Sequence, residues 1–387
     1  MTKTTTRNKQ YNGDHAVLYL SLELGAAKWC LGFSTGLGQK PRRRTIEAGN
    51  TEIFQKEIAA AKKRFRLPQN THVKSCYEAG RDGFWLHRYL TSVGVENIII
   101  DSSSIEVKRK KRRAKTDRLD LEKMLLMLIR YSLGEKKVWS IVRPPSPEEE
   151  DRRQMHRELK SIKREATRTT NRIRGLLATQ GIRISQSMDL EGEKLDAIRT
   201  WDGEPLREGL KNRLRREWKH VLFLKEQISE LTAIRRKQHK EESEPDIKKI
   251  KQLSWFCGIG QESSWVLVRE LFGWRSFQNR RELASLTGLT PTPYDSGSSI
   301  REQGISKSGN RHVRAIAIEM AWAWLRYQPD SSLTLWFNKR FADAGKRARK
   351  VGIVALARKL IIAFWKYLEW GLIPDGAKFK TQEMRIR

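Results

Sequence analysis

The chain has 387 residues, 38% of them hydrophobic and 32% charged, which at roughly 100–200 residues per domain is enough for two or three folded units. Lys and Arg outnumber Asp and Glu by 77 to 45, and the formal net charge of +32 would repel itself in a compact fold unless a polyanion screened it. Nucleic acid is the polyanion that this excess favours, and an acidic membrane surface is the alternative.

Three further features narrow the class of protein. Cys30, Cys76 and Cys257 lie far apart without zinc-ligand spacing, so they predict buried thiols in a reducing compartment. The polar, basic start has no apolar core and does not resemble a signal peptide. The apolar stretch at 351–372 contains three Lys or Arg residues, which predicts an amphipathic or buried helix and no membrane span.

Residues 1–15 are predicted to be a disordered tail, and residues 16–145 a domain of strands and helices. Apolar, β-rich runs predict strands at 16–24, 29–33, 44–47, 72–77 and 97–100. Helices are expected at 51–65, 82–93 and 117–133, the first of them capped by Thr51. The order β-β-β-α-β-α-β-α is that of the RNase H fold.

A proline cluster at 144–147 predicts a domain boundary, followed by long helices over 146–246. The first helix is expected at 148–180, and the second, at 205–242, carries an apolar stripe made of Leu214, Trp218, Val221, Leu224, Ile228 and Leu231. This spacing is typical of a coiled coil between chains, and equally of a helix packed within one chain. Residues 247–387 are predicted to be a mostly helical domain with a glycine- and serine-rich segment at 288–310.

Four carboxylates fall where a metal-dependent phosphoryl-transfer site would need them. Glu23 lies inside the first apolar strand, where a charge needs a partner or a chemical task. Glu78 ends the fourth strand, and Asp117 and Asp120 are three residues apart at a helix start. Carboxylate oxygens are the ligands that Mg²⁺ or Mn²⁺ takes in such sites.

Each of these residues also has a structural interpretation. Glu78 could cap the following helix, Asp117 could be an ordinary N-cap, and Asp120 could simply favour the positive end of the helix dipole. Asp82, Asp101 and Glu122 are weaker candidates for the same site because their positions converge less well.

The flanking residues of the acidic set resemble those of a known family. Residues 114–120 read Ala-Lys-Thr-Asp-Arg-Leu-Asp, similar to the AKTDxxD signature of the DEDD transposases of the insertion-sequence one-ten and eleven-eleven group. Residues 77–80 resemble that family's E-A-T/C-G motif, and residues 171–177 its N-R-I/L-x-G-L-L element. One departure is Glu23, which stands where the family has Asp and adds one methylene to the expected ligand.

The resemblance continues through the C-terminal part. Residues 253–260 precede an apolar helix and read as a helix-hairpin-helix turn whose Gly258 and Gly260 would let backbone N–H groups approach a phosphate; a plain helix-helix turn is the alternative. The segments 288–291, 296–297 and 305–314 then follow the family's GLxP, SG and I-S/T-K-x-G-N-x-x-[LV]-R elements in order.

This likeness implies a serine nucleophile after GLxP, for which Ser296 fits best, with Ser298 and Ser299 as substitutes. From residue chemistry alone, Ser296 would read as a solvated loop serine. Lys307, Arg311 and Arg314 would neutralise phosphates.

A basic run just before the aspartate pair predicts either a solvated loop or a clamp on the nucleic-acid backbone, and consists of Lys108, Arg109, Lys110, Lys111, Arg112, Arg113 and, beyond it, Lys115. Basic residues of the first long helix continue this stripe: Arg152, Arg153, Lys160, Lys163, Arg164, Arg168, Arg172 and Arg174.

Three functions are therefore weighed. The resemblance implies a bridge-RNA-guided serine recombinase of donor and target DNA, with a homodimer through the coiled coil, a tetramer of two dimers and a place in the prokaryotic cytoplasm near the nucleoid. A RuvC-like nuclease or Holliday-junction resolvase is the second hypothesis. A non-catalytic, basic nucleic-acid-binding protein is the third, and Glu23 in place of Asp keeps it open.

Overall fold

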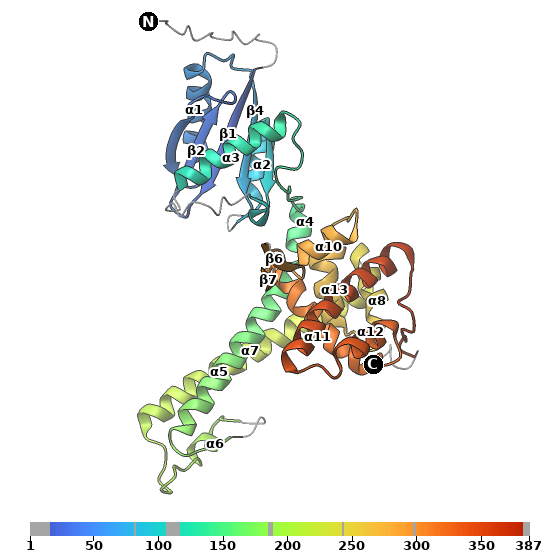
Figure 1. Cartoon of the computed structure of the whole chain (residues 1–387). Coiled ribbons are helices and arrows are strands. Elements are labelled where there is room, and N and C mark those ends of the chain that lie inside the picture. The colour runs from blue at the N-terminus through green and yellow to red at the C-terminus, as the bar shows by residue number, and fades with distance from the viewer. Residues whose placement is uncertain are drawn as a thin grey trace, which may run out of the picture. The chain divides into compact units, whose positions relative to one another are not determined.

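The computed structural model describes residues 16–80, 83–105, 117–184, 189–241, 244–296 and 299–381, without the side chains at 103, 117–118, 293–296 and 299–303. The chain separates into two compact units, residues 1–145 and 146–387 (Figure 1). The division falls within the proline cluster. The second unit contains both the long helices and the C-terminal helices, which the sequence pattern had assigned to two domains.

A five-stranded mixed sheet forms the centre of the first unit. Its strands are β1 (Val17–Leu24), β2 (Lys28–Ser34), β3 (Arg42–Glu47), β4 (His72–Glu78) and β5 (Val95–Ile100). They are arranged in the order β3-β2-β1-β4-β5. β1, β2 and β3 form an antiparallel meander, whereas β4 pairs in parallel with both β1 and β5. Each predicted strand is confirmed to within two residues at either end.

Helices cover both faces of this sheet, which explains why β1 is apolar along most of its length. Leu18, Leu20 and Leu22 pack with residues of α1 (Thr51–Arg64) and α2 (Trp85–Ser92). The alternate residue Tyr19 packs on the opposite face with α3 (Asp117–Ser132). A short 3-10 helix, η2, spans Ser102–Ser104.

Two helix starts differ from the sequence prediction. The cap of α1 is Asn50, whose side chain accepts a hydrogen bond from the Ile53 N–H, and Thr51 is the first helical residue. α2 begins at Trp85, three residues later than expected, and residues 81–82 lie outside the described part of the chain. Phe84 is its N-cap and makes no side-chain capping bond, so Glu78 does not cap this helix.

The second unit opens with a pair of long helices. The predicted helix at 148–180 is broken near Arg152 and Arg153 into α4 (Pro147–Asp151) and α5 (Gln154–Ala178). After the short α6 (Glu193–Asp196) comes α7 (Glu208–Glu241). α5 and α7 run antiparallel, because Arg172 pairs with Glu217 while the earlier residue Glu165 contacts His220.

The first half of the apolar stripe of α7 packs within the chain. Leu214, Trp218 and Val221 are buried in one cluster with Ile173 and Leu177 of α5. These contacts correspond to the interpretation in which the helix packs within one chain and not in a coiled coil between chains. A dimer built on the same residues would have to displace α5.

The C-terminal part packs its helices around one large apolar core that contains Trp265, Trp324 and Phe364. Its elements are α8 (Pro245–Ser254), α9 (Gln261–Leu267), the π-helical η3 (Val268–Phe272), α10 (Arg280–Thr287), β6 (Pro291–Ser296), β7 (Ser299–Ile305), α11 (Arg311–Tyr327), α12 (Ser332–Phe341) and α13 (Lys346–Trp370). The glycine- and serine-rich segment is thus an antiparallel hairpin and not an irregular loop.

The last apolar stretch forms α13, which lies in this core with Leu356, Leu360 and Phe364 buried. This confirms the prediction of a buried helix. In the described ranges, none of the helices combines the length and the apolar character that crossing a bilayer requires.

A short C-terminal segment, residues 378–380, which we call the strap, is hydrogen-bonded to the turn between α8 and α9. The N–H of Cys257 donates to the Lys378 carbonyl at 3.0 Å, and the N–H of Lys380 donates to the Trp255 carbonyl at 2.7 Å. Gln328 is fully buried beside them. Its amide nitrogen donates to the Cys257 and Lys378 carbonyls, and its amide oxygen accepts from the Lys378 N–H at 2.7 Å.

Replacing Gln328 with Ala should lower the free energy of unfolding by about 2–4 kcal/mol, because three part-buried hydrogen bonds to the backbone are lost at once. Chemical denaturation of the whole chain measures this loss. Gln261→Ala, at an exposed position of α9, is the matched control and should change stability by less than about 0.5 kcal/mol. Equal effects of the two substitutions would contradict this account of the strap.

Candidate functional site

Two of the four predicted carboxylates belong to neighbouring strands of the sheet. In the parallel pair β1 and β4, Leu22 lies opposite Tyr77, so Glu23 and Glu78 are the next residues on the two strands. Adjacent strands are about 4.8 Å apart. Side chains alternate along a strand, so both carboxylates fall on the face opposite to Leu22, which is the face that α3 covers.

α3 is held against this face by contacts in its first turns. The Ser21 hydroxyl donates to the Leu121 carbonyl at 2.9 Å, and the Cys76 thiol contacts the Met124 carbonyl at 3.8 Å. Burial raises the pKa of Cys76 well above its ordinary value, so this thiol is a packing group. A Cβ at Gly32 would lie 3.0 Å from Leu121, so glycine allows the close approach of α3 to β2.

The other two carboxylates therefore start a helix that lies on the same face as Glu23 and Glu78. Asp117 is the first residue of α3, and Asp120 is in its first turn, half-buried. Glu122, one of the weaker candidates, instead forms an ion pair with Arg43 at 3.0 Å. Among the side chains that the structure describes, no three His, Cys, Asp or Glu are gathered closely enough to hold a metal ion. Asp117 lies outside that set, so the four-carboxylate site stays a prediction.

The predicted nucleophile Ser296 is the last residue of β6, where it pairs with Ser299, the first residue of β7. Two residues, 297 and 298, connect the strands and lie outside the described part of the chain, as does the fallback candidate Ser298 with them. The backbone therefore carries Ser296 at the tip of the hairpin formed by β6 and β7, which we call the serine hairpin.

The base of the serine hairpin is closed by two glycine-dependent contacts. The Asn310 N–H donates to the Leu286 carbonyl at 2.9 Å, and the Lys307 N–H donates to the Gly288 carbonyl at 3.3 Å. Gly288 and Gly309 both have positive φ, and a Cβ on either would lie about 2 Å from a carbonyl oxygen of the other segment. The two motif segments around these glycines are thus locked together by backbone contacts.

The three basic residues predicted to contact phosphate near this base differ in their surroundings. Lys307 is exposed and has a positive φ of 55°, and Arg311 is exposed as the first residue of α11. Arg314 instead donates from one guanidinium nitrogen to the carbonyls of Lys307 at 2.9 Å and Ser308 at 3.3 Å. Arg314 therefore has a structural role that the sequence pattern did not indicate.

A buried carboxylate that the sequence analysis missed lies next to this base. The Glu270 side chain is fully buried in η3. It accepts from His156 Nε2 at 2.8 Å, from Arg157 Nε at 2.7 Å and Nη2 at 2.8 Å, and from Asn310 Nδ2 at 2.7 Å. Burial by itself raises the pKa of Glu270, but the hydrogen bonds from Arg157 and His156 outweigh it and hold the pKa far below its ordinary value.

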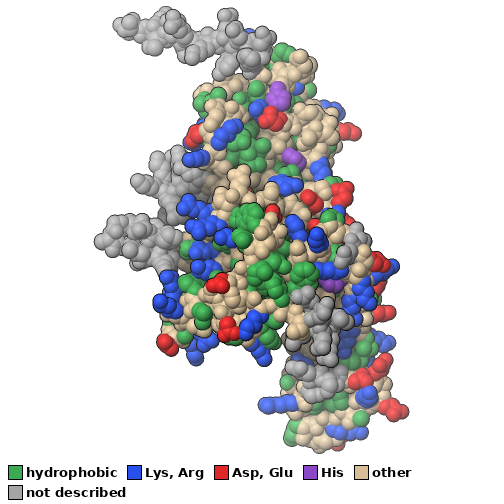
Figure 2. Space-filling model, turned by 90° about the vertical axis from the view of Figure 1, so that its right-hand side faces the viewer, with side chains coloured by type: hydrophobic (Ala, Val, Ile, Leu, Met, Phe, Trp, Pro, Cys, Tyr) green, Lys and Arg blue, Asp and Glu red, His purple; other side chains and the backbone are tan. Residues whose placement is uncertain are grey.

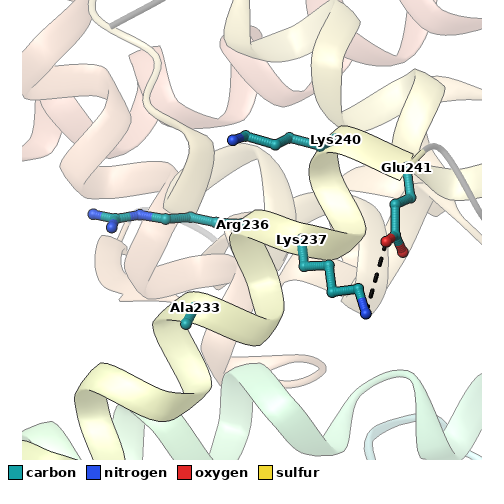
Figure 3. A pocket seen from close by; sticks show the side chains of 5 residues that line it. All are labelled: Ala233, Arg236, Lys237, Lys240 and Glu241. Carbon is teal, nitrogen blue, oxygen red and sulfur yellow. Dashed lines mark ion pairs between the residues drawn. The ribbon is translucent and has the colours of Figure 1, made fainter.

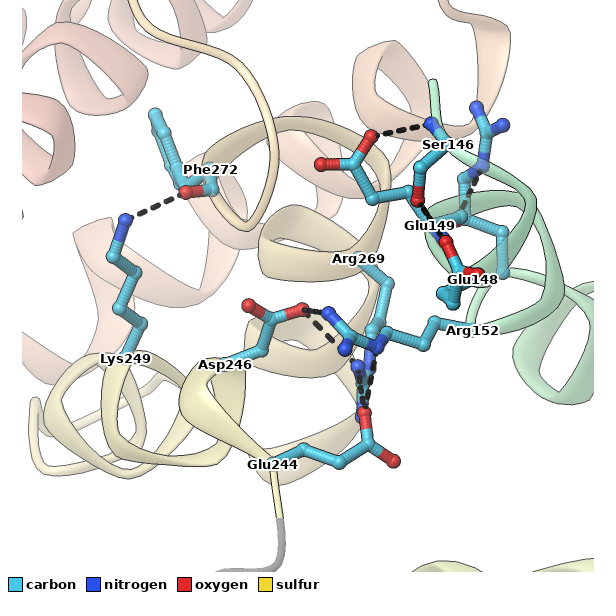
Figure 4. Close-up of polar contacts among 10 residues, drawn as sticks. Ser146, Glu148, Glu149, Arg152, Glu244, Asp246, Lys249, Arg269 and Phe272 are labelled. Carbon is cyan, nitrogen blue, oxygen red and sulfur yellow. Dashed lines mark hydrogen bonds and ion pairs between the residues drawn. The ribbon is translucent and has the colours of Figure 1, made fainter.

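The preceding residue, Arg269, belongs to a second buried cluster (Figure 4). Its guanidinium donates to Glu244 at 2.6 Å and to Asp246 at 3.1 Å, and Arg152 also approaches Glu244 at 3.2 Å. Burial raises the pKa of Asp246 in spite of the two arginines. The adjacent residues Arg269 and Glu270 of η3 thus belong to two separate clusters, the first with Glu244 and Asp246 and the second with residues of α5 and Asn310.

The predicted phosphate-binding turn between α8 and α9 has a packing explanation at Gly258. A Cβ there would lie 3.0 Å from Tyr327 and 3.1 Å from the Ala323 carbonyl, both in α11. Gly260 faces open space and is the N-cap of α9. Packing against α11 therefore explains Gly258 as it would in an ordinary helix-helix turn. Contact of this turn with phosphate stays a prediction.

A basic groove lies along the paired helices α5 and α7. It has a volume of about 600 Å³, and its lining consists of Ser161, Arg164, Glu165, Arg168, Thr169, Arg172 and His220. The three arginines are four residues apart and so share one face of α5. Arg172 is bound to Glu217 at 2.6 Å, whereas Arg164 and Arg168 make no ion pair within the described chain. Lys and Arg side chains are also spread over the face of the protein seen in Figure 2.

A second hollow, of about 460 Å³, lies at the end of α7 (Figure 3). Arg236 and Lys240 extend to the same side of the helix there, while Lys237 pairs with Glu241 at 3.8 Å. The run at 108–113 and Lys115, predicted as a backbone clamp, lie outside the described residues.

Comparison with known proteins identifies the family. The chain is 38% identical over 382 residues to the putative transposase y4rJ of Sinorhizobium fredii (strain NBRC 101917 / NGR234), an alignment that covers 95% of this chain and 96% of that protein. Residues 251–335 match the model of the family described as Transposase IS116/IS110/IS902 family. The chain belongs to the IS116/IS110/IS902 transposase family.

More distant relatives agree with this assignment. The transposase for insertion sequence element IS1328 of Yersinia enterocolitica is 26% identical over 234 residues, which are 59% of this chain and 66% of that protein. The transposase for insertion sequence element IS1111A of Coxiella burnetii (strain RSA 493 / Nine Mile phase I) is 26% identical over 52% of this chain and 54% of its own length. The chain is thus an insertion-sequence transposase, an enzyme that cuts and recombines DNA, and its matched region includes Glu270, the serine hairpin and Asn310.

The Glu270 cluster predicts a stability that falls in acid. The folded-state pKa lies below the unfolded value of 4.5, so the contribution of this group is present above pH 4.5 and is lost as the pH falls through the folded pKa. Denaturant midpoints measured from pH 7 to pH 3 should therefore fall for the wild type. Glu270→Gln should cost about 3–5 kcal/mol at pH 7 and should show a flatter decline in acid.

His312, whose pKa is also lowered by burial, adds to the decline in both proteins. Glu262→Gln is the control, because Glu262 makes only an exposed ion pair with Lys163. Its curve should follow the wild type throughout. A wild-type curve parallel to that of Glu270→Gln below pH 5 would show that Glu270 is not the group responsible.

Proposed function

We propose that this transposase cuts and exchanges DNA strands through a composite site, made of metal-binding carboxylates in the first unit and Ser296 in the second. The observation that carries this proposal is the position of Ser296 at the tip of a hairpin whose base is locked by Gly288 and Gly309. A hairpin with a locked base restricts the positions that the serine can take relative to a substrate, and an irregular loop would restrict them less.

The proposed carboxylate site consists of Glu23, Glu78, Asp117 and Asp120 on an RNase H-like domain of RuvC type. The mixed sheet in the order β3-β2-β1-β4-β5 and the placement of α3 over β1 support it. These residues would hold Mg²⁺ or Mn²⁺, which supplies Lewis-acid stabilisation of a phosphate when bound. Their oxygens are suited to such ions, and Glu23 offers the same ligand type as Asp on a longer side chain.

The proposed chemistry at Ser296 is a transesterification. The hydroxyl oxygen attacks a DNA phosphorus and forms an Oγ–P bond, while the P–O bond to the neighbouring sugar breaks. The serine proton leaves, and the released sugar oxygen takes up a proton, so that the phosphodiester count is unchanged and a phosphoserine link to DNA results. Lys307 and Arg311, both exposed near the hairpin base, would neutralise other phosphates of the bound DNA.

Guidance by a bridge RNA and assembly of two dimers into a tetramer are further parts of the proposal. They derive from the family resemblance in the sequence motifs. The net charge of +32 and the basic groove on α5 support binding of nucleic acid to this unit. Leu214, Trp218 and Val221 of the α7 stripe pack against α5, so a helical dimer contact would use other residues of this pair.

A strand-transfer assay should separate the roles of the two proposed sites. Wild type, Ser296→Ala and Asp117→Ala are incubated with Mg²⁺, the RNA of the element, and donor and target DNA. Each substitution should reduce recombinant product at least about 1,000-fold, because each removes a group that takes part in the bond-making step. Ser296→Ala should abolish the covalent protein–DNA adduct altogether while leaving DNA affinity unchanged, whereas Asp117→Ala keeps the nucleophile and should only slow formation of the adduct.

The matched controls are Ser299→Ala on the facing strand and Glu122→Gln on the same helix as Asp117, both of which should recombine normally. Normal recombination by Ser296→Ala would refute the serine assignment, and normal recombination by Asp117→Ala the acidic site. DNA cleavage by the wild type without strand exchange would favour the RuvC-like nuclease or resolvase.

The groove on α5 predicts a salt-dependent contribution to nucleic-acid affinity. The double substitution of Arg164 and Arg168 with Ala removes two positive charges that no carboxylate of the described chain neutralises. If each contacts one phosphate, the slope of log K against log salt should fall by about 1.8 for duplex DNA, or about 1.4 for a single strand.

Arg213 and Arg216, exposed on α7 outside the groove, give a control with the same loss of charge. Their replacement with Ala should alter the slope much less. Equal slopes for the two double variants would mean that the groove has no specific part in binding.

A further inference from the structure

Asn310 divides the two ends of its side-chain amide between different tasks. Its Oδ1 accepts from the N–H groups of His312 at 2.8 Å and Val313 at 3.2 Å, and so caps α11. Its Nδ2 donates to Glu270 at 2.7 Å. Its own backbone N–H closes the base of the serine hairpin by donating to Leu286. One residue therefore joins the buried carboxylate, the start of α11 and the hairpin base.

The partners of Asn310 also fix the orientation of its amide. Two backbone N–H groups require an acceptor on one side, and a carboxylate requires a donor on the other. An aspartate at this position would face Glu270 with a second negative charge, and a serine would cap the helix but would be too short to reach Glu270. The carboxylate of Glu270 is held in turn by His156 and Arg157 of α5.

We propose that Glu270 is a positioning residue that sets the serine hairpin, acting through Asn310, relative to α5 and its row of arginines. The chemical consequence rests on the proposed role of Ser296, whereas the positioning itself does not. The carboxylate is not a catalytic residue, since it is fully buried and bound to His156, Arg157 and Asn310. It makes the helix that lines the basic groove and the hairpin base parts of one rigid body.

Asn310→Ser removes the hydrogen bond from residue 310 to Glu270, which we call the tether, without removing the helix cap. Ser caps a helix about as well as Asn, so the melting temperature of the full chain should fall by no more than a few degrees. The tether to Glu270 is lost, and misplacement of the hairpin should slow formation of the protein–DNA adduct about 10–100-fold. DNA affinity should remain within about twofold, since the groove on α5 is untouched.

Amide hydrogen exchange reports the positioning independently of any chemistry. The N–H groups of Ser306, Lys307 and residue 310 close the hairpin base, and they should exchange at least about tenfold faster in Asn310→Ser than in the wild type. The exchange of peptides from α13, which is remote in sequence and buried in the core, should stay unchanged.

A charge-swapped pair provides the rescue. Asn310→Asp alone sets two carboxylates against each other and should open the base more than Asn310→Ser does. Combined with Glu270→Gln, the new amide at position 270 can donate to the new carboxylate at position 310, so the double variant should protect the base better than Asn310→Asp alone. A double variant that exchanges faster than Asn310→Asp would overturn the proposal.

Asp246→Asn is the matched control, since it changes a buried carboxylate that binds Arg269, the neighbour of Glu270 in η3, but has no link to the hairpin (Figure 4). It should leave exchange at the hairpin base as in the wild type. The proposal is overturned if Asn310→Ser leaves that exchange unchanged, or if Asp246→Asn accelerates it equally. If the wild type forms no adduct, the role of Ser296 fails, and the exchange measurements alone decide the positioning role.

Discussion

The second unit depends on one buried charge that is satisfied on every side. Glu270 lies in a π-helical turn of the core and draws together a histidine and an arginine of α5 and the asparagine that starts α11. Removing a carboxylate from water is costly, and several charge-assisted hydrogen bonds are needed to offset that cost. Because the partners come from elements far apart in the chain, the carboxylate forms its bonds only when these elements are assembled together.

The excess of positive charge is distributed unevenly between interior and surface. Inside the second unit, carboxylates such as Glu270, Glu244 and Asp246 neutralise the arginines that are buried or half-buried with them. On the outer face of α5, Arg164 and Arg168 have no such partner in the described chain. The net charge of the whole sequence therefore understates the field at this face, where a polyanion would be attracted and would lose affinity as salt rises.

The sequence predicted those strands and helices that are determined by local residue patterns. The apolar run of β1 and the existence of the helices were foreseeable because periodicity is encoded within a few residues, whereas the capping residue of α1 and the start of α2 were misplaced. The strand β6 was not foreseeable, because Pro291 and Pro293 disfavour a strand and the contacts that lock its base are tertiary. The only local sign of Glu270 is an Arg-Glu pair inside the apolar run 265–272, and its partners are 114, 113 and 40 residues away. The identities of the acidic candidates were likewise readable, but their geometry around an ion was not.

The locked base of the serine hairpin also limits how the serine can travel. Ser296 is five residues beyond Pro291, and at about 3.3 Å per residue an extended strand carries it roughly 17 Å from the base. This length exceeds the width of the DNA major groove, which is about 12 Å. The hairpin therefore acts as an arm of fixed length. In the proposed mechanism, such an arm would bring the Ser296 hydroxyl to a DNA strand that lies beyond the reach of the hairpin base.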